Sequence, residues 1–300
     1  AMARPRVLLA FSFFDAPLQS SPLMLPGVRA VLPRWQLSRQ GHGAWLRLQR
    51  PLGAEITPRF VAEELWEMAQ HLERAKWPQP PAVIPQVLSR SPWQQAYRGA
   101  MDQALALVER GELRKLVLAV RQQLQLDSPL NPQMLLAGLR KCQAGSCRFL
   151  WGEADGSVLV GASPERLLAV RNGQLRCDAL AGTAALGEPA QALLQSSKDR
   201  HEHELVVGAI RSVLQQQGLK PVCLRQPRLA RHGTLRHLHT PISASLAGQQ
   251  LLTLAEALHP TPAVAGLPRR EAMAWLRSLE PFERGPYAAP IGWLDSAGDG

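Results

Sequence analysis

Long apolar runs are missing from this sequence of 300 residues, whose longest apolar stretches, such as Val7 to Phe14, are only long enough for strands. A transmembrane helix needs about 18 or more consecutive apolar residues, so we expect no membrane-spanning segment. Two arginines before a short apolar run make the first residues a poor signal peptide. A hydrophobic content of 46% with 19% charged residues excludes a disordered chain. The length suggests roughly two domains.

Cysteine is scarce, and the four residues of this type form no C-x-x-C pair or other zinc-binding spacing. Unpaired cysteines are typical of reducing compartments. We therefore predict buried thiols in a cytoplasmic protein, at the following positions: Cys142, Cys147, Cys177 and Cys223.

Acidic residues are absent between Leu205 and Ala255, a stretch with six lysines or arginines, and the whole chain has a formal net charge of +10. A basic surface of this kind serves a nucleic acid or a small anion. The same stretch has no aromatic residue on which bases could stack, and no helix-turn-helix, zinc-finger or RRM pattern occurs. We therefore expect a small anionic ligand, such as a dicarboxylate, and no nucleic-acid partner.

Common nucleotide and hydrolase motifs are also missing. No Gly-x-Ser-x-Gly, P-loop or G-x-G-x-x-G pattern is present, so the sequence supports neither a serine hydrolase nor a Rossmann enzyme. Runs of strands with helices between them predict an α+β fold. A proline-rich linker from Trp77 to Ser91 predicts a strand-rich region over residues 1–90 and a core over residues 91–300.

The periodicity of apolar residues and the turn residues predict the individual elements. Asp155-Gly156 and Asn172-Gly173 are strong hairpin turns. Strands are expected at 6–14, 29–37, 44–51, 113–126, 147–151, 157–162, 167–178, 221–225, 235–245 and 287–294, and helices at 58–74, 92–109 (capped by Ser91), 132–142, 196–217, 249–258 and 269–279.

Two segments carry single residues suited to acid–base chemistry. Lys115 opens an apolar strand, where desolvation lowers the pKa of a lysine and makes it a candidate general base. Alternatively, it is an exposed lysine at a strand end. Glu165, in Gly161-Ala-Ser-Pro-Glu-Arg166, follows a strand and would serve as a general acid in an apolar pocket. Alternatively, it interacts with a helix dipole.

Acidic and imidazole side chains alternate from Lys198 to Glu204. Asp199 and Glu202 are three residues apart and share one face of a helix, which suits Mg²⁺ because that ion prefers oxygen ligands. A solvated charged helix start is an equally good interpretation. His201 and His203 are two apart and do not match the spacing of a helical zinc site.

Two further segments favour ligand contacts. Gly182 and Thr183, in Ala181-Gly-Thr, would hold a carboxylate through a backbone N–H and a hydroxyl, although an ordinary turn is also consistent with them. His237 alternates with apolar residues in a predicted strand, where most histidines are structural.

Taken together and in order, these segments resemble the chorismate-utilising enzymes, from about Ser91 to the end of the chain. Pro260-Thr-Pro with Ala263 is similar to the isochorismate synthase branch of menaquinone or phylloquinone biosynthesis. The matching segments begin at Lys115 (KLVLA), Gly161 (GASPER), Ala181 (AGT), Lys198 (KDRHEHE), His237 (HL), Leu258 (LHPTPAVAGLP), Glu280 (EPFERGPY) and Pro290 (PIGW).

The resemblance implies a sandwich of two large, mostly antiparallel sheets with helices outside. It implies Mg²⁺-dependent conversion of chorismate to isochorismate, with water added at C2 and the C4 hydroxyl lost. Lys115 would be the base and Glu165 the acid. Glu202 would bind Mg²⁺ directly and Asp199 indirectly. The substrate would contact Gly182, Thr183, His237, Ala263 and Tyr287.

The family pattern continues beyond Gly300, with an arginine, a glycine-rich segment and further metal-binding glutamates. We therefore expect a C-terminally truncated chain, which leaves its own activity open. A salicylate synthase, which also eliminates pyruvate, and a catalytically inactive chorismate-binding homologue are the alternatives. We expect chorismate as the small-molecule substrate, no membrane partner, and a monomer.

Overall fold

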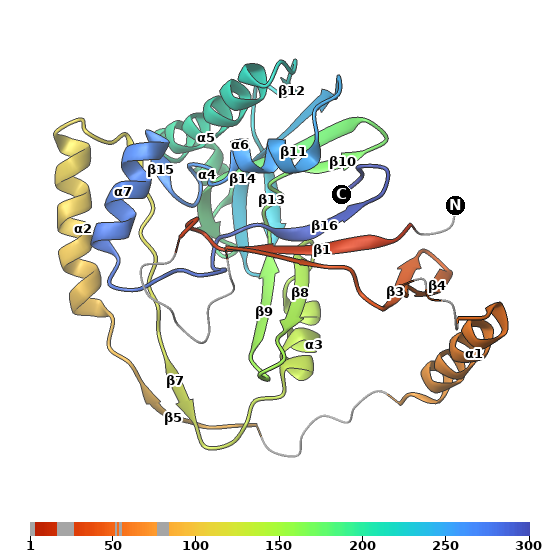
Figure 1. The fold of residues 1–300 in the computed structure, drawn as a ribbon. Coiled ribbons are helices and arrows are strands. Elements are labelled where there is room, and N and C mark those ends of the chain that lie inside the picture. The colour runs from red at the N-terminus through yellow and green to blue at the C-terminus, as the bar shows by residue number, and fades with distance from the viewer. Residues whose placement is uncertain (1–3, 17–26, 52, 54–55, 77–83) are drawn as a thin grey trace.

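A computed structural model describes residues 4–16, 27–51, 53, 56–76 and 84–300, and its fold is shown in Figure 1. Runs of strands alternate with helices along these residues. The helices are α1 (Pro58–Arg74), α2 (Gln94–Glu109), α3 (Pro132–Cys142), α4 (Ala190–Gln195), α5 (Ser197–Gln216), α6 (Leu251–Leu258) and α7 (Arg269–Leu279). The strands are β1 (Arg6–Phe11), β2 (Val28–Val31), β3 (Trp35–Gln40), β4 (Gly43–Leu48), β5 (Val87–Arg90), β6 (Lys115–Leu116), β7 (Leu124–Leu126), β8 (Cys147–Gly152), β9 (Val158–Ser163), β10 (Ala169–Arg171), β11 (Gln174–Ala185), β12 (Val222–Cys223), β13 (Arg228–His232), β14 (Leu235–Ser245), β15 (Gly266–Leu267) and β16 (Ile291–Asp295).

All strand pairs among the described residues are antiparallel, which confirms the α+β class. The largest sheet has five strands in the order β10-β11-β14-β12, with β13 also on β14. A second sheet has the order β16-β1-β2, and four strand pairs complete the described set: β15-β6, β3-β4, β5-β7 and β8-β9. The hydrogen-bonded sheets are therefore smaller and more numerous than the two large ones we expected.

Both predicted hairpin turns are present. Asn172 and Gly173 have φ values of 51° and 71° and join β10 to β11, as the Asn-Gly turn requires. Gly156 has φ of 87° in the turn between β8 and β9. These turns set the register of the strands that lead to Glu165 and Gly182.

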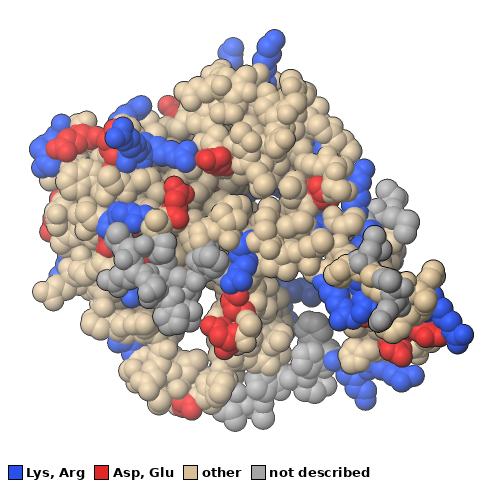
Figure 2. Space-filling view, in the orientation of Figure 1, with Lys and Arg blue, Asp and Glu red and all other residues tan. Residues whose placement is uncertain are grey.

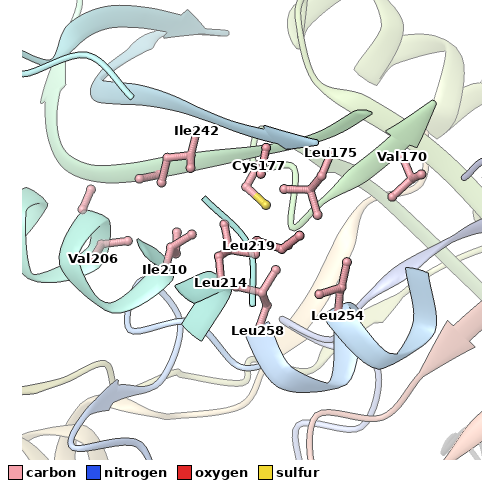
Figure 3. Packing of buried hydrophobic residues seen from close by; sticks show 13 residues of the cluster. Val170, Leu175, Cys177, Val206, Ile210, Leu214, Leu219, Ile242, Leu254 and Leu258 are labelled. Carbon is pink, nitrogen blue, oxygen red and sulfur yellow. The ribbon is translucent and has the colours of Figure 1, made fainter. Parts of the chain in front are cut away.

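The main core lies between α5 and the five-stranded sheet. Val206, Ile210 and Leu214 recur at every fourth residue of α5 and face Cys177 and Ile242 of the sheet, as Figure 3 shows. Burial raises the pKa of the Cys177 thiol to about 12, with a smaller contribution from Asp178. The buried stripe fixes the rotation of α5, and therefore the side chains that α5 presents to the site.

The prediction of buried thiols is correct for Cys177 and wrong for two others. Cys142 and Cys147 are exposed, because they lie at the end of α3 and the start of β8, at the surface of the molecule. Cys223 is half-buried at β12.

Several element boundaries also differ from prediction, and the strand predicted over 29–37 is two strands, β2 and β3, in different sheets. Helix α2 begins at Gln94 rather than at the predicted Pro92, because the hydroxyl and backbone of Ser91 pair with the backbone of Gln123. The strand predicted over 113–126 is interrupted after Leu116. Beyond that point the backbone also makes a hydrogen bond to a side chain instead of to a neighbouring strand: the amide of Ala119 donates to the carboxylate of Glu280.

The first and last described strands lie side by side, because β1 pairs with β16 over its length (Figure 1). The β3–β4 hairpin and α1 lie to one side of the main body in this view. Part of the predicted linker, residues 77–83, lies outside the described residues, and the division into regions 1–90 and 91–300 stays a prediction. Within the described part of the chain, no helix is long and apolar enough to cross a membrane.

Charged side chains of both signs are interspersed on the face shown in Figure 2, with wide areas that carry neither. On this face the basic residues do not form one continuous stripe. On this face the basic side chains therefore lie in separate groups. The place of an anion-binding site depends on which basic side chains lie close together.

Candidate active site

Lys115 and Glu202 form an ion pair that joins β6 to the first turns of α5. Their Nζ and Oε1 atoms are 2.8 Å apart. The side chain of Lys115 is 11% exposed and that of Glu202 is 37% exposed. The exposed-lysine interpretation is therefore wrong, because Lys115 points inward from the strand toward a carboxylate.

Glu165 lies in the turn that follows β9, where its carboxyl group is enclosed. Thr261 donates a hydrogen bond of 3.4 Å from Oγ1 to Oε1 of Glu165. Burial raises the pKa of Glu165 to about 7; Thr261 and the charge of Lys115 oppose this shift, and Asp178 adds to it. A substantial fraction of Glu165 therefore carries a proton at neutral pH, as a general acid requires.

Gly182 and Thr183 lie at an irregularity in β11, where the register against β14 shifts between Ala181 and Thr183. Gly182 has φ of +75°, a left-handed conformation that glycine adopts at little cost. Thr183 Oγ1 lies 2.8 Å from Nδ1 of His237 on the neighbouring strand. Burial and the nearby His232 lower the pKa of His237, so its imidazole is neutral at pH 7.

Replacing Gly182 with alanine should reduce the free energy of unfolding by about 1–3 kcal/mol, because a β-carbon there is strained by the positive φ. That carbon would also lie 3.1 Å from Cβ of Asp199 and 3.3 Å from Cδ1 of Leu238. Urea denaturation measures the change. Gly187→Ala is the matched control, because a β-carbon at that position meets nothing within 4 Å. Equal effects of both substitutions would contradict this account.

Asp199 lies in the first turn of α5, where its carboxylate is hydrogen-bonded to the N-cap residue of the same helix. The hydroxyl of the N-cap Ser196 accepts from the amide of Asp199 and donates to its carboxylate. Among the described residues, no group of three or more histidine, cysteine, aspartate or glutamate side chains is placed to hold a metal ion. Glu202, with Asp199 one turn earlier in α5, is nevertheless a suitable ligand for Mg²⁺. That ion often binds one or two protein carboxylates and keeps several waters.

Ala263 and Tyr287 are less closely tied to these residues. Ala263 packs against the edge of the main core, two residues beyond Thr261. Tyr287 lies in the turn before β16 and is 62% exposed, and its amide donates to the carbonyl of Arg284. The ion pair, the hydrogen bond and the charge of Lys115 thus link Lys115, Glu202, Glu165 and Thr261, and no described contact joins Tyr287 to them.

Two positions near Glu165 were not predicted from the sequence. Thr261 lies inside the Pro260-Thr-Pro motif, and the sequence does not predict its contact with Glu165. Asp178 is paired with His239 at 2.9 Å and with Arg166 at 3.6 Å. A charged residue in the otherwise apolar centre of β11 was the only signal in the sequence.

A buried ion pair fixes the strand that carries Lys115. Arg284 donates from Nε to Oε2 of Glu280 at 2.8 Å, and further bonds of 2.8 Å go to the carbonyls of Val117 and Val264. Glu280 in turn accepts from the amide of Ala119 at 2.8 Å. One pair of side chains therefore ties the segment after Lys115 to the segment after Thr261.

Comparisons with known proteins find relatives among the isochorismate synthases. The salicylate biosynthesis isochorismate synthase of Pseudomonas aeruginosa is 42% identical over 212 residues, which are 68% of this chain and 44% of that protein. The isochorismate synthase EntC of Escherichia coli K12 is 36% identical over 70% of this chain and 56% of that protein. The chain spans about half the length of these curated relatives.

The solved structure of MenF, the menaquinone-specific isochorismate synthase of Escherichia coli, has the same fold. It superposes with a TM-score of 0.81 at 28% identity and covers 97% of this chain and 66% of that one. The model of the chorismate binding enzyme family matches residues 1–300. This chain therefore belongs to the chorismate binding enzyme family.

Proposed function

We propose that this protein is an isochorismate synthase, which converts chorismate to isochorismate in a Mg²⁺-dependent reaction. The observation that carries the proposal is a buried carboxyl group, Glu165, whose raised pKa lets it hold a proton within the electrostatic reach of the inward-facing amine of Lys115. The relatives named isochorismate synthase support the same reaction.

The reaction replaces one hydroxyl group with another, so the protein needs one base and one acid. Lys115, as the neutral amine, would take a proton from the water that attacks C2 of the ring. Glu165 would give its proton to the C4 hydroxyl, which leaves as water while the ring double bonds shift. The atoms balance, because one water enters and one leaves.

The remaining residues would hold the substrate. The backbone of Gly182 and the hydroxyl of Thr183 would bind the ring carboxylate, and the imidazole of His237 would lie against the ring. The neutral state of His237 supports a packing role rather than a charge–charge contact. Tyr287 would reach the pyruvyl carboxylate from its exposed turn, and Ala263 would line the pocket.

Mg²⁺ would be held by Glu202, with Asp199 supporting it from the start of α5. Bound there, the ion supplies positive charge that neutralises the ring carboxylate. Glu202 offers a partly exposed carboxylate for this role. The four free thiols are consistent with a reaction in a reducing compartment such as the cytoplasm, and a monomer stays a prediction.

The names of the relatives point to two different pathways that could use the product. Similarity to MenF favours menaquinone or phylloquinone biosynthesis. Similarity to the relative named for salicylate biosynthesis favours the supply of isochorismate to another enzyme. Both branches use the same first reaction, and this reaction is the function we propose.

Incubation of the protein with chorismate and Mg²⁺, without ammonia, should yield isochorismate on chromatographic separation. Chelation of the metal should abolish the product, and added Mg²⁺ should restore it. Salicylate as the final product would instead assign the chain to the pyruvate-eliminating enzymes. Chorismate binding without turnover, measured by calorimetry, would contradict the proposed activity in favour of an inactive binding homologue.

A further inference from the structure

A second cavity lies on the opposite side of α5 from the Lys115–Glu202 ion pair. It is a groove of about 660 Å³ between α5 and the segment Pro221–Pro227, which includes β12. Figure 1 shows α5 and β12 together at one end of the molecule. The groove volume falls within the range of about 300–1,000 Å³ that is typical of small-molecule sites. The groove is not lined by any residue of the candidate active site.

A glycine in the middle of α5 gives the groove its width. Gly208 lines the groove, and a β-carbon built on it would meet nothing within 4 Å. Glycine is a poor helix former, so its place in the middle of a 20-residue helix is not explained by local stability. The missing side chain leaves space that a ligand can fill.

Arginines border this space. Arg200, Arg211 and Arg225 line the groove, and Glu204 is the one acidic side chain in its lining. Arg200 is half-buried and reaches across the groove, where its Nη2 lies 3.3 Å from Oε1 of Gln226. A guanidinium held in this way is suited to a planar anion such as a carboxylate.

The rest of the lining contains no lysine, arginine, aspartate or glutamate. His203 and Thr240 form the buried floor and are hydrogen-bonded to each other at 2.8 Å. Val207 and Leu224 add apolar walls. The groove thus combines a cationic border with an apolar interior.

We propose that this groove is a second ligand site, which binds a small organic anion with an apolar body. The apolar part would lie over Gly208 and Val207, and the anionic group would contact Arg200 and Arg211. The proposal does not depend on the reaction at Lys115 and Glu165. Because α5 carries both the groove and Glu202, the two sites share one rigid element.

The probe for this site is 8-anilinonaphthalene-1-sulfonate, an anion with an apolar body whose fluorescence rises on binding. Titration of the full chain should give one saturable site. Gly208→Met, which fills the groove, should raise the Kd at least tenfold. Arg200→Gln and Arg211→Gln should each raise it about three- to tenfold and weaken its dependence on salt.

Two control variants separate this site from other binding. Gly138→Met, in α3, also adds a side chain where a β-carbon meets nothing within 4 Å, and should leave the Kd within twofold. Lys115→Ala should also leave it unchanged. Thermal melts of each variant exclude unfolding as the cause. An unchanged Kd in Gly208→Met, or a loss of binding in Lys115→Ala, would overturn the proposal.

Discussion

Arg284→Met is expected to lower the free energy of unfolding by about 3–5 kcal/mol, because it leaves Glu280 as a buried charge without a partner. Arg284 and Glu280 are 5% and 7% exposed. The substitution also removes the donors to the carbonyls of Val117 and Val264. Urea denaturation, analysed by linear extrapolation, measures the loss.

Two control variants show whether the buried charge causes this loss. The double variant Glu280→Gln with Arg284→Met should be more stable than Arg284→Met alone, because it carries no buried charge. The Arg110–Glu112 pair has a similar distance of 2.7 Å but is about half exposed. Arg110→Met should change stability by no more than about 1 kcal/mol. Equal losses at Arg284 and Arg110 would refute the argument.

The same pair explains why the sequence predicts the strand at Lys115 only in part. Glu280 and Arg284 are four residues apart, a spacing that in sequence is typical of a solvent-exposed helical pair. Their partners at Val117 and Ala119 lie more than 160 residues away in the chain. Apolar alternation predicts an unbroken strand over 113–126, whereas side chains from the far end of the chain replace its ladder bonds.

Elements with local determinants are predicted well. The bounds of α1 and α3 match the predictions, since each begins with proline after a capping residue, Thr57 or Asn131. The turns at Gly156 and Gly173 are likewise decided by their own residues. Short elements without such signals, such as α4, are not predicted.

The candidate site shows the same division between local and distant determinants. The family resemblance predicts Lys115, Glu165 and Glu202 as site residues. Only the tertiary structure shows that Lys115 contacts Glu202 and that Thr261 contacts Glu165. Burial of the Glu165 carboxyl depends on segments nearly 100 residues away in the chain. Its pKa therefore could not be predicted from the sequence near the residue.

Glu165→Gln should reduce the turnover of chorismate by about 10²–10⁴-fold, because glutamine keeps the shape of glutamate but has no proton to give to the leaving hydroxyl. The substrate's KM should change much less, since the substitution leaves the proposed substrate contacts at Gly182 and Thr183 untouched. Steady-state kinetics of both proteins at pH 7 measure the two parameters. A variant with nearly full turnover would exclude Glu165 as the acid.

The same substitution should change how stability depends on pH. The folded protein holds the Glu165 proton up to a pKa of about 7, whereas the unfolded chain releases it near the ordinary value of 4.5. Between these values the folded state binds the extra proton, so the free energy of unfolding falls as pH rises and levels off above pH 7. The loss attributable to this group is at most about 3.5 kcal/mol, because one pKa unit corresponds to about 1.4 kcal/mol.

Glutamine does not titrate, so the Glu165→Gln protein should lack this loss and should be more stable than the wild type at pH 8. Urea denaturation at pH 5 and pH 8 gives the comparison, and the difference between the proteins should be smallest at the lower pH. An inactive variant that is also stabilised at pH 8 would tie both effects to one carboxyl group, because the burial that makes Glu165 an acid also makes its charged form costly. Equal pH dependence in the two proteins would mean that Glu165 ionises as it does in water, and the argument for acid catalysis would fail with it.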